Sequence, residues 1–411
     1  MQGIGPGAKT RITPQNLYNP PMNPITAKLP DFEAMLGTLV ATPSVSCTDP
    51  AIDQSNLGVI HHLAGWLEDL GFTVEDTPLP GNPNKGNLIA RIGPDEDGLV
   101  LAGHTDTVPY DDGAWQSDPF ALSDRDDAYY GLGTCDMKGF FPLVIEAVQQ
   151  LDLKKLTRGL AVIATADEES SMAGARLLTE SGAPKARYAI VGEPTGLTPV
   201  YAHKGIAMLS LRLEGHTGHS SDPSLGCNAL DAMHILMGEL ITLREALAQR
   251  HRHPGFAVQV PTMNLGCLHA GDNPNRICGS AELQIDLRLL PGMDSEAVLE
   301  QVRKTALAVA ERTGTRAQVN AFYPPVPPFE GAPEGALIRT LKDVTGTAPE
   351  TVAFGTEAPF YQALGMETVV FGAGGIDQAH QPNEYLHKGQ IETGKSALTY
   401  CINAFCMGAS S

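Results

Sequence analysis

The sequence has few cysteines and few cations, and it lacks any long apolar run. Its seven cysteines among 411 residues form no CxxC pair, which excludes a disulfide framework and a cysteine-rich zinc cluster and favours a reducing cytoplasm. No stretch is apolar for long enough to cross a bilayer, and residues 1–30 lack the apolar segment that a signal peptide needs. With 28 basic against 47 acidic residues the formal net charge is −19, so neither a nucleic acid nor an anionic membrane is expected as a partner.

The chain is long enough for more than one domain. Residues 1–30 are rich in Gly, Pro, Asn and Thr and predict a mobile N-terminal extension. Residues 31–204 and 323–411 alternate apolar strands with segments of helical period, which predicts one α/β domain with a mixed twisted sheet and helices on both faces. Residues 205–322 follow the order β-α-β-β-α-β, so we expect an inserted α+β domain of ferredoxin-like fold.

A polar pair follows one of the predicted strands. The apolar run at residues 99–103 ends in His104, and Asp106 comes two residues later. Ligands of open α/β sheets bind beyond the carboxyl ends of the strands, so His104 is expected to face a crevice. Alternation along a strand puts Asp106 on the same side, where its carboxylate can accept the second ring N–H of a metal-bound imidazole. By itself, however, a lone His-x-Asp is more often a satisfied core histidine, so the metal-ligand interpretation of His104 depends on the other motifs.

Further strands end in the same kind of side chain. The apolar strand at residues 160–166 leads to three consecutive acids, which are costly at a strand tip unless they are solvated or paired with cations. Asp136 precedes the helix expected from residue 140, where it could be either a metal ligand or an N-cap. The repeated pattern of apolar strand, glycine and ligand-type side chain favours a common site, with candidates Asp136, Glu168, Glu169, Glu193 and His380.

These residue types suit a particular metal chemistry. Two histidines and several carboxylates, without clustered cysteine, are the ligands of zinc or a neighbouring divalent ion. Their number fits two ions about 3.5–4 Å apart that share one carboxylate and one hydroxide and polarise a carbonyl group. Glu168 is expected to point to the opposite face from Glu169, which leaves it free to act as a general base.

The motifs also resemble those of a known family. His104-x-Asp106, Gly133-x-x-Asp136, Glu168-Glu169, Gly192-Glu193-Pro194 and Ala379-His380-x-Pro382-x-Glu384 are similar to the successive motifs of the M20 family of co-catalytic metallopeptidases and deacylases. The similarity runs from about Leu29 to near the C-terminus.

The resemblance implies a dinuclear centre and assigns its ligands. Asp136 would bridge two divalent ions, with zinc expected and cobalt as a substitute. His104 and Glu193 would complete one metal site, and Glu169 and His380 would complete the other.

Other residues receive roles from the same resemblance. Glu168 would activate the bridging water, and Asp106 would orient His104. The α/β domain would be catalytic, and the inserted domain would be a lid through which the protein forms a homodimer. His219 on that lid would reach the active site of the partner subunit.

The expected substrate contacts come from two loops. Asn275 and Arg276 on the lid resemble the position that binds the α-carboxylate of the substrate, although Arg276 could also be an ordinary surface arginine in a turn. Thr356 and Glu357 lie in the family's substrate loop, which is less rich in glycine here.

Within the family, residues 102–113 and 131–141 are most similar to members that hydrolyse N2-acetyl-L-ornithine to L-ornithine and acetate in arginine biosynthesis. Aminoacylases, succinyl-diaminopimelate desuccinylases and N-acetylcitrulline deacetylases would share every ligand and differ in their pockets. A metal-stabilised binding protein is the non-catalytic alternative, but it would not need Glu168.

Overall fold

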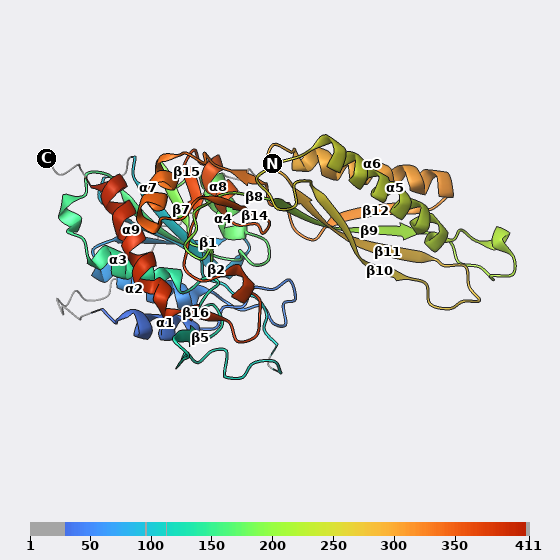
Figure 1. The fold of residues 1–411 in the computed structure, drawn as a ribbon. Helices are drawn as coiled ribbons and strands as arrows, with labels where there is room; N and C mark the ends of the chain where they lie inside the picture. The colour runs from blue at the N-terminus through green and yellow to red at the C-terminus, as the bar shows by residue number, and fades with distance from the viewer. Residues whose placement is uncertain (1–28, 95–96, 112, 408–411) are drawn as a thin grey trace, which may run out of the picture.

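The computed structural model describes residues 29–94, 97–111 and 113–407. The predicted N-terminal extension, residues 1–30, lies outside this part except for its last two residues. Figure 1 shows two bodies, a large sheet covered by helices and a smaller, elongated sheet with two helices on one face. No helix in the described part is long and apolar enough to span a membrane.

The larger body is organised around a mixed sheet. Within the described residues this sheet has nine strands in the order β1-β2-β6-β3-β7-β15-β8-β13, with β14 paired to β8. The pairs β6–β3, β3–β7 and β7–β15 are parallel, whereas β1–β2, β2–β6 and β13–β8 are antiparallel. The strands are β1 Thr73–Leu79, β2 Asn82–Ile92, β3 Leu99–His104, β6 Leu160–Thr165, β7 Tyr188–Val191, β8 Val200–His203, β13 Phe329–Glu330, β14 Glu350–Val352 and β15 Glu367–Val370. The carboxyl ends of the parallel strands therefore meet at one edge of the sheet.

Alternate residues of the central strands enter two different cores. Leu99 and Leu101 of β3 pack in the main core, whereas Val100 and Ala102 pack on the other face of the sheet. This two-sided burial explains why these strands are continuous apolar runs in the sequence. The main core is covered by α1 Phe32–Val40, α2 Leu57–Asp69, α3 Phe140–Gln149, α7 Ala336–Thr345 and α9 Ile391–Cys406, and the other face by α4 Ala173–Ser181 and α8 Ala358–Ala363.

The smaller body is formed by consecutive residues between β8 and β13. Its strands pair antiparallel in the order β10-β11-β9-β12, which is the ferredoxin-like arrangement. Alternate residues of β9 and β11 are buried against the two helices, and the side-chain caps Asn228 and Asp294 begin those helices. The elements are β9 Gly205–Glu214, α5 Ala229–Arg250, β10 Thr262–Ala270, β11 Ser280–Leu289, α6 Ser295–Thr313 and β12 Arg316–Ala321.

The remaining elements are short. A three-stranded sheet in the order β16-β5-β4 packs beside the large sheet, and single 3₁₀ turns join several elements. They are β4 Ser123–Arg125, β5 Ala128–Tyr130, β16 Tyr385–His387, η1 Leu153–Lys155, η2 Pro223–Leu225, η3 Ile376–Gln378 and η4 Lys388–Gln390. The predicted fold class is confirmed: a mixed α/β domain with helices on both faces and an additional ferredoxin-like α+β unit.

Candidate metal centre and active site

The polar side chains that follow the parallel strands gather at one edge of the large sheet. His104 is the last residue of β3, and the loops after β6, β7 and β15 supply Glu168, Glu169, Glu193 and His380. Asp136 comes from the loop between β5 and α3. Ligand-type atoms of these side chains lie within 4.8 Å of one another in three groups. The residues in these groups are His104, Asp136, Glu168, Glu169, Glu193 and His380.

Asp136 lies between two of the groups. Its Oδ1 is 3.1 Å from His104 Nε2, and its Oδ2 is 3.5 Å from His380 Nε2. His104 and Asp136 form one group with Glu193, and Asp136 and His380 form the other with Glu169. The two oxygens of one carboxylate therefore face opposite halves of the cluster, as a bridging ligand requires. Asp136 is not an N-cap, because the helix after it, α3, has Gly139 at that position.

Glu168 is also part of the cluster, which corrects one expectation from the sequence. Its carboxylate forms the third group, with His104 and Glu169, and does not point to the opposite face. The alternation of side chains applies only within a strand, and β6 already ends at Thr165. Residues 168–170 form a turn, which allows neighbouring side chains to face the same centre.

The cluster concentrates negative charge away from water. Burial raises the pKa of Glu168 and the pKa of Glu193 well above the usual value of a glutamate. Burial also opposes ionisation of Asp136, but hydrogen bonds to His104 and His380 outweigh it and hold the pKa of Asp136 below its usual range. Hydrogen bonds to Asp136 and Glu169 raise the pKa of His380 to about 10.

These side chains fit divalent metal ions in their donor chemistry. They offer imidazole nitrogens and carboxylate oxygens, and Glu193 Oε1 is buried without a hydrogen-bond partner. A cation would both pair this orphaned oxygen and reduce the repulsion among the acids.

Two buried carboxylates hold the loops that carry the cluster. Glu384, which belongs to the motif with His380 but had no expected role, accepts hydrogen bonds from the backbone N–H groups of Gly133, Cys135 and Asp136 at 2.7–2.9 Å. This contact joins two loops that are far apart in sequence, so no local pattern could have assigned it.

The other buried carboxylate is Asp106, which contacts a different partner from the one expected. The Nδ1–H of His104 donates to the backbone carbonyl of Asp106 at 3.0 Å, and the carboxylate Oδ1 of Asp106 is 3.6 Å from that nitrogen. The two carboxylate oxygens accept instead from the backbone N–H groups of Glu168 and Glu169, at 3.2 and 3.0 Å. The expected orientation of His104 therefore comes mainly from the Asp106 backbone, and the side chain fixes the turn with the two glutamates.

A cavity of about 400 Å³ adjoins the cluster. Glu168, Glu169 and His380 line one side of it, and Arg288 of β11 and Tyr323 line another. The cavity thus lies between the large sheet and the ferredoxin-like unit, with the cluster at its wall. No signal in the sequence points to Arg288 or Tyr323, because nothing in the local pattern shows which outward residues of the smaller sheet face the larger body.

The two candidates from the substrate loop do not line this cavity. Thr356 and Glu357 are fully buried, while the neighbouring Gly355 lines the cavity in their place. Neither carboxylate oxygen of Glu357 has a hydrogen-bond partner in the described part of the chain, and burial raises the pKa of Glu357 to about 7.

The candidates on the ferredoxin-like unit lie far from the cluster. The connection between β9 and α5 lies at the end of the smaller sheet that points away from the large sheet (Figure 1). His219 is part of this connection. Its Nδ1 is 2.7 Å from Ser221 Oγ, and its backbone pairs with that of Arg276. Arg276 pairs with Asp272 at 2.6 Å, and the backbone carbonyl of Asn275 accepts from the same connection. The chain therefore does not bring these residues to its own cluster.

We expect a glutamine at position 357 to change how stability depends on pH. A carboxyl whose pKa is raised by folding binds more protons in the folded state, so stability falls as pH rises from about 4.5 to about 7. A rise of this size in the pKa corresponds to a decrease of roughly 3 kcal/mol in the free energy of unfolding between pH 5 and 8. Metal-free Glu357→Gln should lose less stability than the metal-free parent over this range in urea titrations. Equal decreases of the free energy of unfolding in both proteins would show that ionisation of Glu357 does not cause this pH dependence.

The comparisons with known proteins agree with this geometry. The sequence pattern described as "Peptidase family M20/M25/M40" matches residues 100–404. Curated acetylornithine deacetylases from Pectobacterium atrosepticum and Pectobacterium carotovorum subsp. carotovorum are each 47% identical over 378 residues, which are 92% of this chain and 98% of each relative.

Solved structures share the fold at lower identity. A metallo-carboxypeptidase of the M20 family from Sulfolobus solfataricus has a TM-score of 0.72 and 19% identity, with 92% of this chain and 99% of that chain covered. A Bacillus subtilis protein described as a dinuclear metal-binding peptidase of the same family has a TM-score of 0.63 and 18% identity, with 91% and 97% covered.

Proposed function

Because the chain belongs to peptidase family M20/M25/M40, we propose that it is a metal-dependent amide hydrolase that removes acetate from N2-acetyl-L-ornithine. The substrate is proposed from the 47% identity to acetylornithine deacetylases over nearly their whole length. The reaction type rests on one observation, the carboxylate of Glu168 beside the metal-type ligands and in the wall of the cavity.

The five ligand candidates support a centre for two divalent ions, which we propose to be zinc with cobalt as a substitute. His104 and Glu193 would hold one ion, Glu169 and His380 the other, and Asp136 both. When bound, such ions lower the pKa of water and polarise an amide carbonyl group.

Glu168 would move the proton in this reaction. Among the residues that the structure describes, none forms a hydrogen bond with its carboxylate, whereas its backbone N–H is held by Asp106. It can therefore accept the proton of the attacking water and return it to the amine that leaves as the C–N bond breaks. The raised pKa of Glu168 is expected to fall when cations neutralise the neighbouring acids.

The remaining proposals concern assembly and location. Residues 31–204 and 323–411 would form the catalytic domain, and residues 205–322 the lid and the contact of a homodimer. In such a dimer His219 and Arg276 could serve the partner's site, which is consistent with their distance from their own. A cytoplasmic location is proposed from the seven cysteines, all of which are free.

A panel of N-acylated amino acids tests the proposed substrate. With zinc or cobalt present, N2-acetyl-L-ornithine should have the highest kcat/KM, because a pocket for a cationic side chain rejects analogues that leave its polar groups unpaired. The panel should include N-acetylcitrulline, acetylated apolar amino acids and N-succinyl-diaminopimelate, with Glu168→Gln as the control for contaminating activity. Preference for the succinylated substrate would overturn the proposed specificity while leaving the metal chemistry intact.

A further inference from the structure

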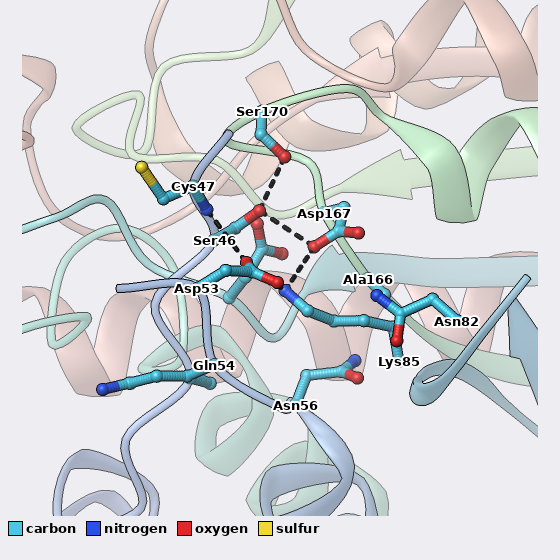
Figure 2. A network of polar contacts seen from close by, with 12 residues as sticks. Ser46, Cys47, Asp53, Gln54, Asn56, Asn82, Lys85, Ala166, Asp167 and Ser170 are labelled. Atoms are coloured by element: carbon cyan, nitrogen blue, oxygen red, sulfur yellow. Dashed lines mark hydrogen bonds and ion pairs between the residues drawn. The ribbon is translucent and has the colours of Figure 1, made fainter. Parts of the chain in front are cut away.

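A buried lysine lies behind the turn that carries Glu168 and Glu169. Lys85 on β2 is 1% exposed, and its Nζ lies 2.8 Å from Asp53 Oδ1 and 2.6 Å from Asp167 Oδ1 (Figure 2). Burial by itself would lower the pKa of Lys85, but the hydrogen bonds to the two carboxylates outweigh it, so the amine stays charged. A buried ammonium must be paired, and here the pairing fixes the position of Asp167.

Asp167 immediately precedes Glu168 and sets the path of the turn. Its φ of +58° lies in the left-handed region, which a non-glycine residue keeps only when surrounding contacts hold it there. Its carboxylate also accepts a hydrogen bond from Ser46 Oγ at 2.9 Å, and Ser46 Oγ lies 2.7 Å from Ser170 Oγ (Figure 2). Lys85 and Ser46 thus hold the residues on both sides of the two glutamates.

The turn is held from two directions. Asp106 accepts the backbone N–H groups of Glu168 and Glu169, and Lys85 binds the side chain of the residue before them. Since the contacts act on successive residues, a shift of Asp167 moves the peptide units from which both glutamate side chains extend. Lys85 itself does not line the cavity, so it has no direct access to a substrate there.

We propose that Lys85 is a positioning residue for the reaction, which acts through Asp167 to hold the Glu168 carboxylate at the place that proton transfer requires. The inference rests on the proposed function of Glu168 as the base. A misplacement of about 1 Å can cost roughly 100-fold in rate, so a contact one residue away from the base is close enough to matter.

The first test compares two lysines that are each paired with two carboxylates. Lys85→Met removes the ammonium and keeps most of the side-chain volume. Lys395→Met is the matched control, because Lys395 on α9 binds Glu146 and Glu392 at 3.3 and 2.6 Å. Both variants should lower the melting temperature, but only Lys85→Met should lower kcat, by about 10- to 100-fold with KM within about twofold. Values of kcat within about twofold of the parent in Lys85→Met would overturn the proposal.

The second test asks whether the loss passes through Glu168. In the Glu168→Gln protein the positioned base is already gone, so at saturating Co²⁺ adding Lys85→Met should lower the residual kcat by less than about twofold. If Lys85 mattered only for stability, or acted elsewhere, Lys85→Met would lower kcat by the same factor in the Glu168→Gln protein as in the parent. A multiplied loss would therefore reject positioning of Glu168.

Binding of Co²⁺ provides a readout that does not need turnover. Glu169 shares the turn, so Lys85→Met should weaken Co²⁺ binding roughly tenfold relative to Lys395→Met. If no substrate of the panel is hydrolysed, the proposed function fails, whereas the positioning of the turn is still judged by Co²⁺. Equal Co²⁺ affinity in Lys85→Met and Lys395→Met would overturn the proposed positioning of the turn by Lys85.

A milder variant covers the case in which Lys85→Met does not fold. Ser46→Ala removes the hydroxyl between Asp167 and Ser170 and leaves the buried ion pairs intact. It should lower kcat about three- to tenfold at unchanged KM. A Ser46→Ala protein with the parent's kcat would count against the role of this network in positioning the turn.

Discussion

Glutamine at position 168 should leave a folded protein that retains its metal ions and hydrolyses the substrate roughly 10²–10⁴-fold more slowly, the range expected for loss of a general base. The amide has the size of the carboxylate but cannot take a proton from water. Asp106 binds the backbone N–H of this residue rather than its side chain, so the turn should keep its path. The measurements are kcat on N2-acetyl-L-ornithine and elemental analysis of the metal after dialysis.

The neighbouring glutamate provides the matched variant. Glu169 contacts His380 at 3.1 Å in the half of the cluster that also contains Asp136. Glu169→Gln should therefore lose metal on dialysis, whereas Glu168→Gln keeps it. Equal metal loss in both variants would contradict the division of roles between the adjacent acids.

Alanine at position 219 should retain both metal ions and the fold and still lose about 10²–10³ in kcat, as removal of one preorganised hydrogen-bond donor does in other enzymes. His219 is exposed at the end of the smaller sheet and contacts no ligand candidate of its own chain. Such a large effect is expected only if His219 stabilises the oxyanion in the partner subunit's site. His216→Ala, in the same connection, is the control and should have a far smaller effect.

Subunit mixing separates action across a dimer from action within one chain. A heterodimer of His219→Ala and Glu168→Gln contains one site in which an intact Glu168 meets an intact His219. Mixing the two variants should therefore restore part of the activity. Absence of recovery after confirmed subunit exchange would argue against donation across the dimer, and unchanged activity of His219→Ala alone would remove His219 from the mechanism.

The sequence was most informative where a local pattern determines the structure. Continuous apolar runs predicted the buried strands β3, β6 and β7, and the polar residues after them predicted the edge at which the cluster lies. The β-α-β-β-α-β order predicted the ferredoxin-like unit because all of its elements lie in one continuous segment of the chain and follow a known arrangement.

The sequence was least informative where the structure depends on contacts between distant residues. Glu168 was expected on the opposite face because the alternation of the strand was extended past Thr165, although β6 ends there and Glu168 lies in the following turn. Nothing near Lys85 in the sequence shows that it pairs with Asp167, 82 residues later. The contact of Glu384 with the loop of Asp136 spans 248 residues and was equally invisible.

The position of β15 has a consequence for how the protein acquires its fold. β15 lies between β7 and β8 in the sheet, although residues 205–322, the whole ferredoxin-like unit, are synthesised after β8 and before β15. The ferredoxin-like unit can fold from contacts within its own segment. The large sheet cannot join β7 to β8 until β15 has been synthesised, and the pairing of β15 with β7 closes a loop of more than 150 residues. His380 follows β15 in the chain, so during synthesis the acidic ligand candidates and His104 leave the ribosome before His380 does. Pulse-labelled hydrogen exchange during refolding should accordingly detect protection in β9 and β11 before protection in β7.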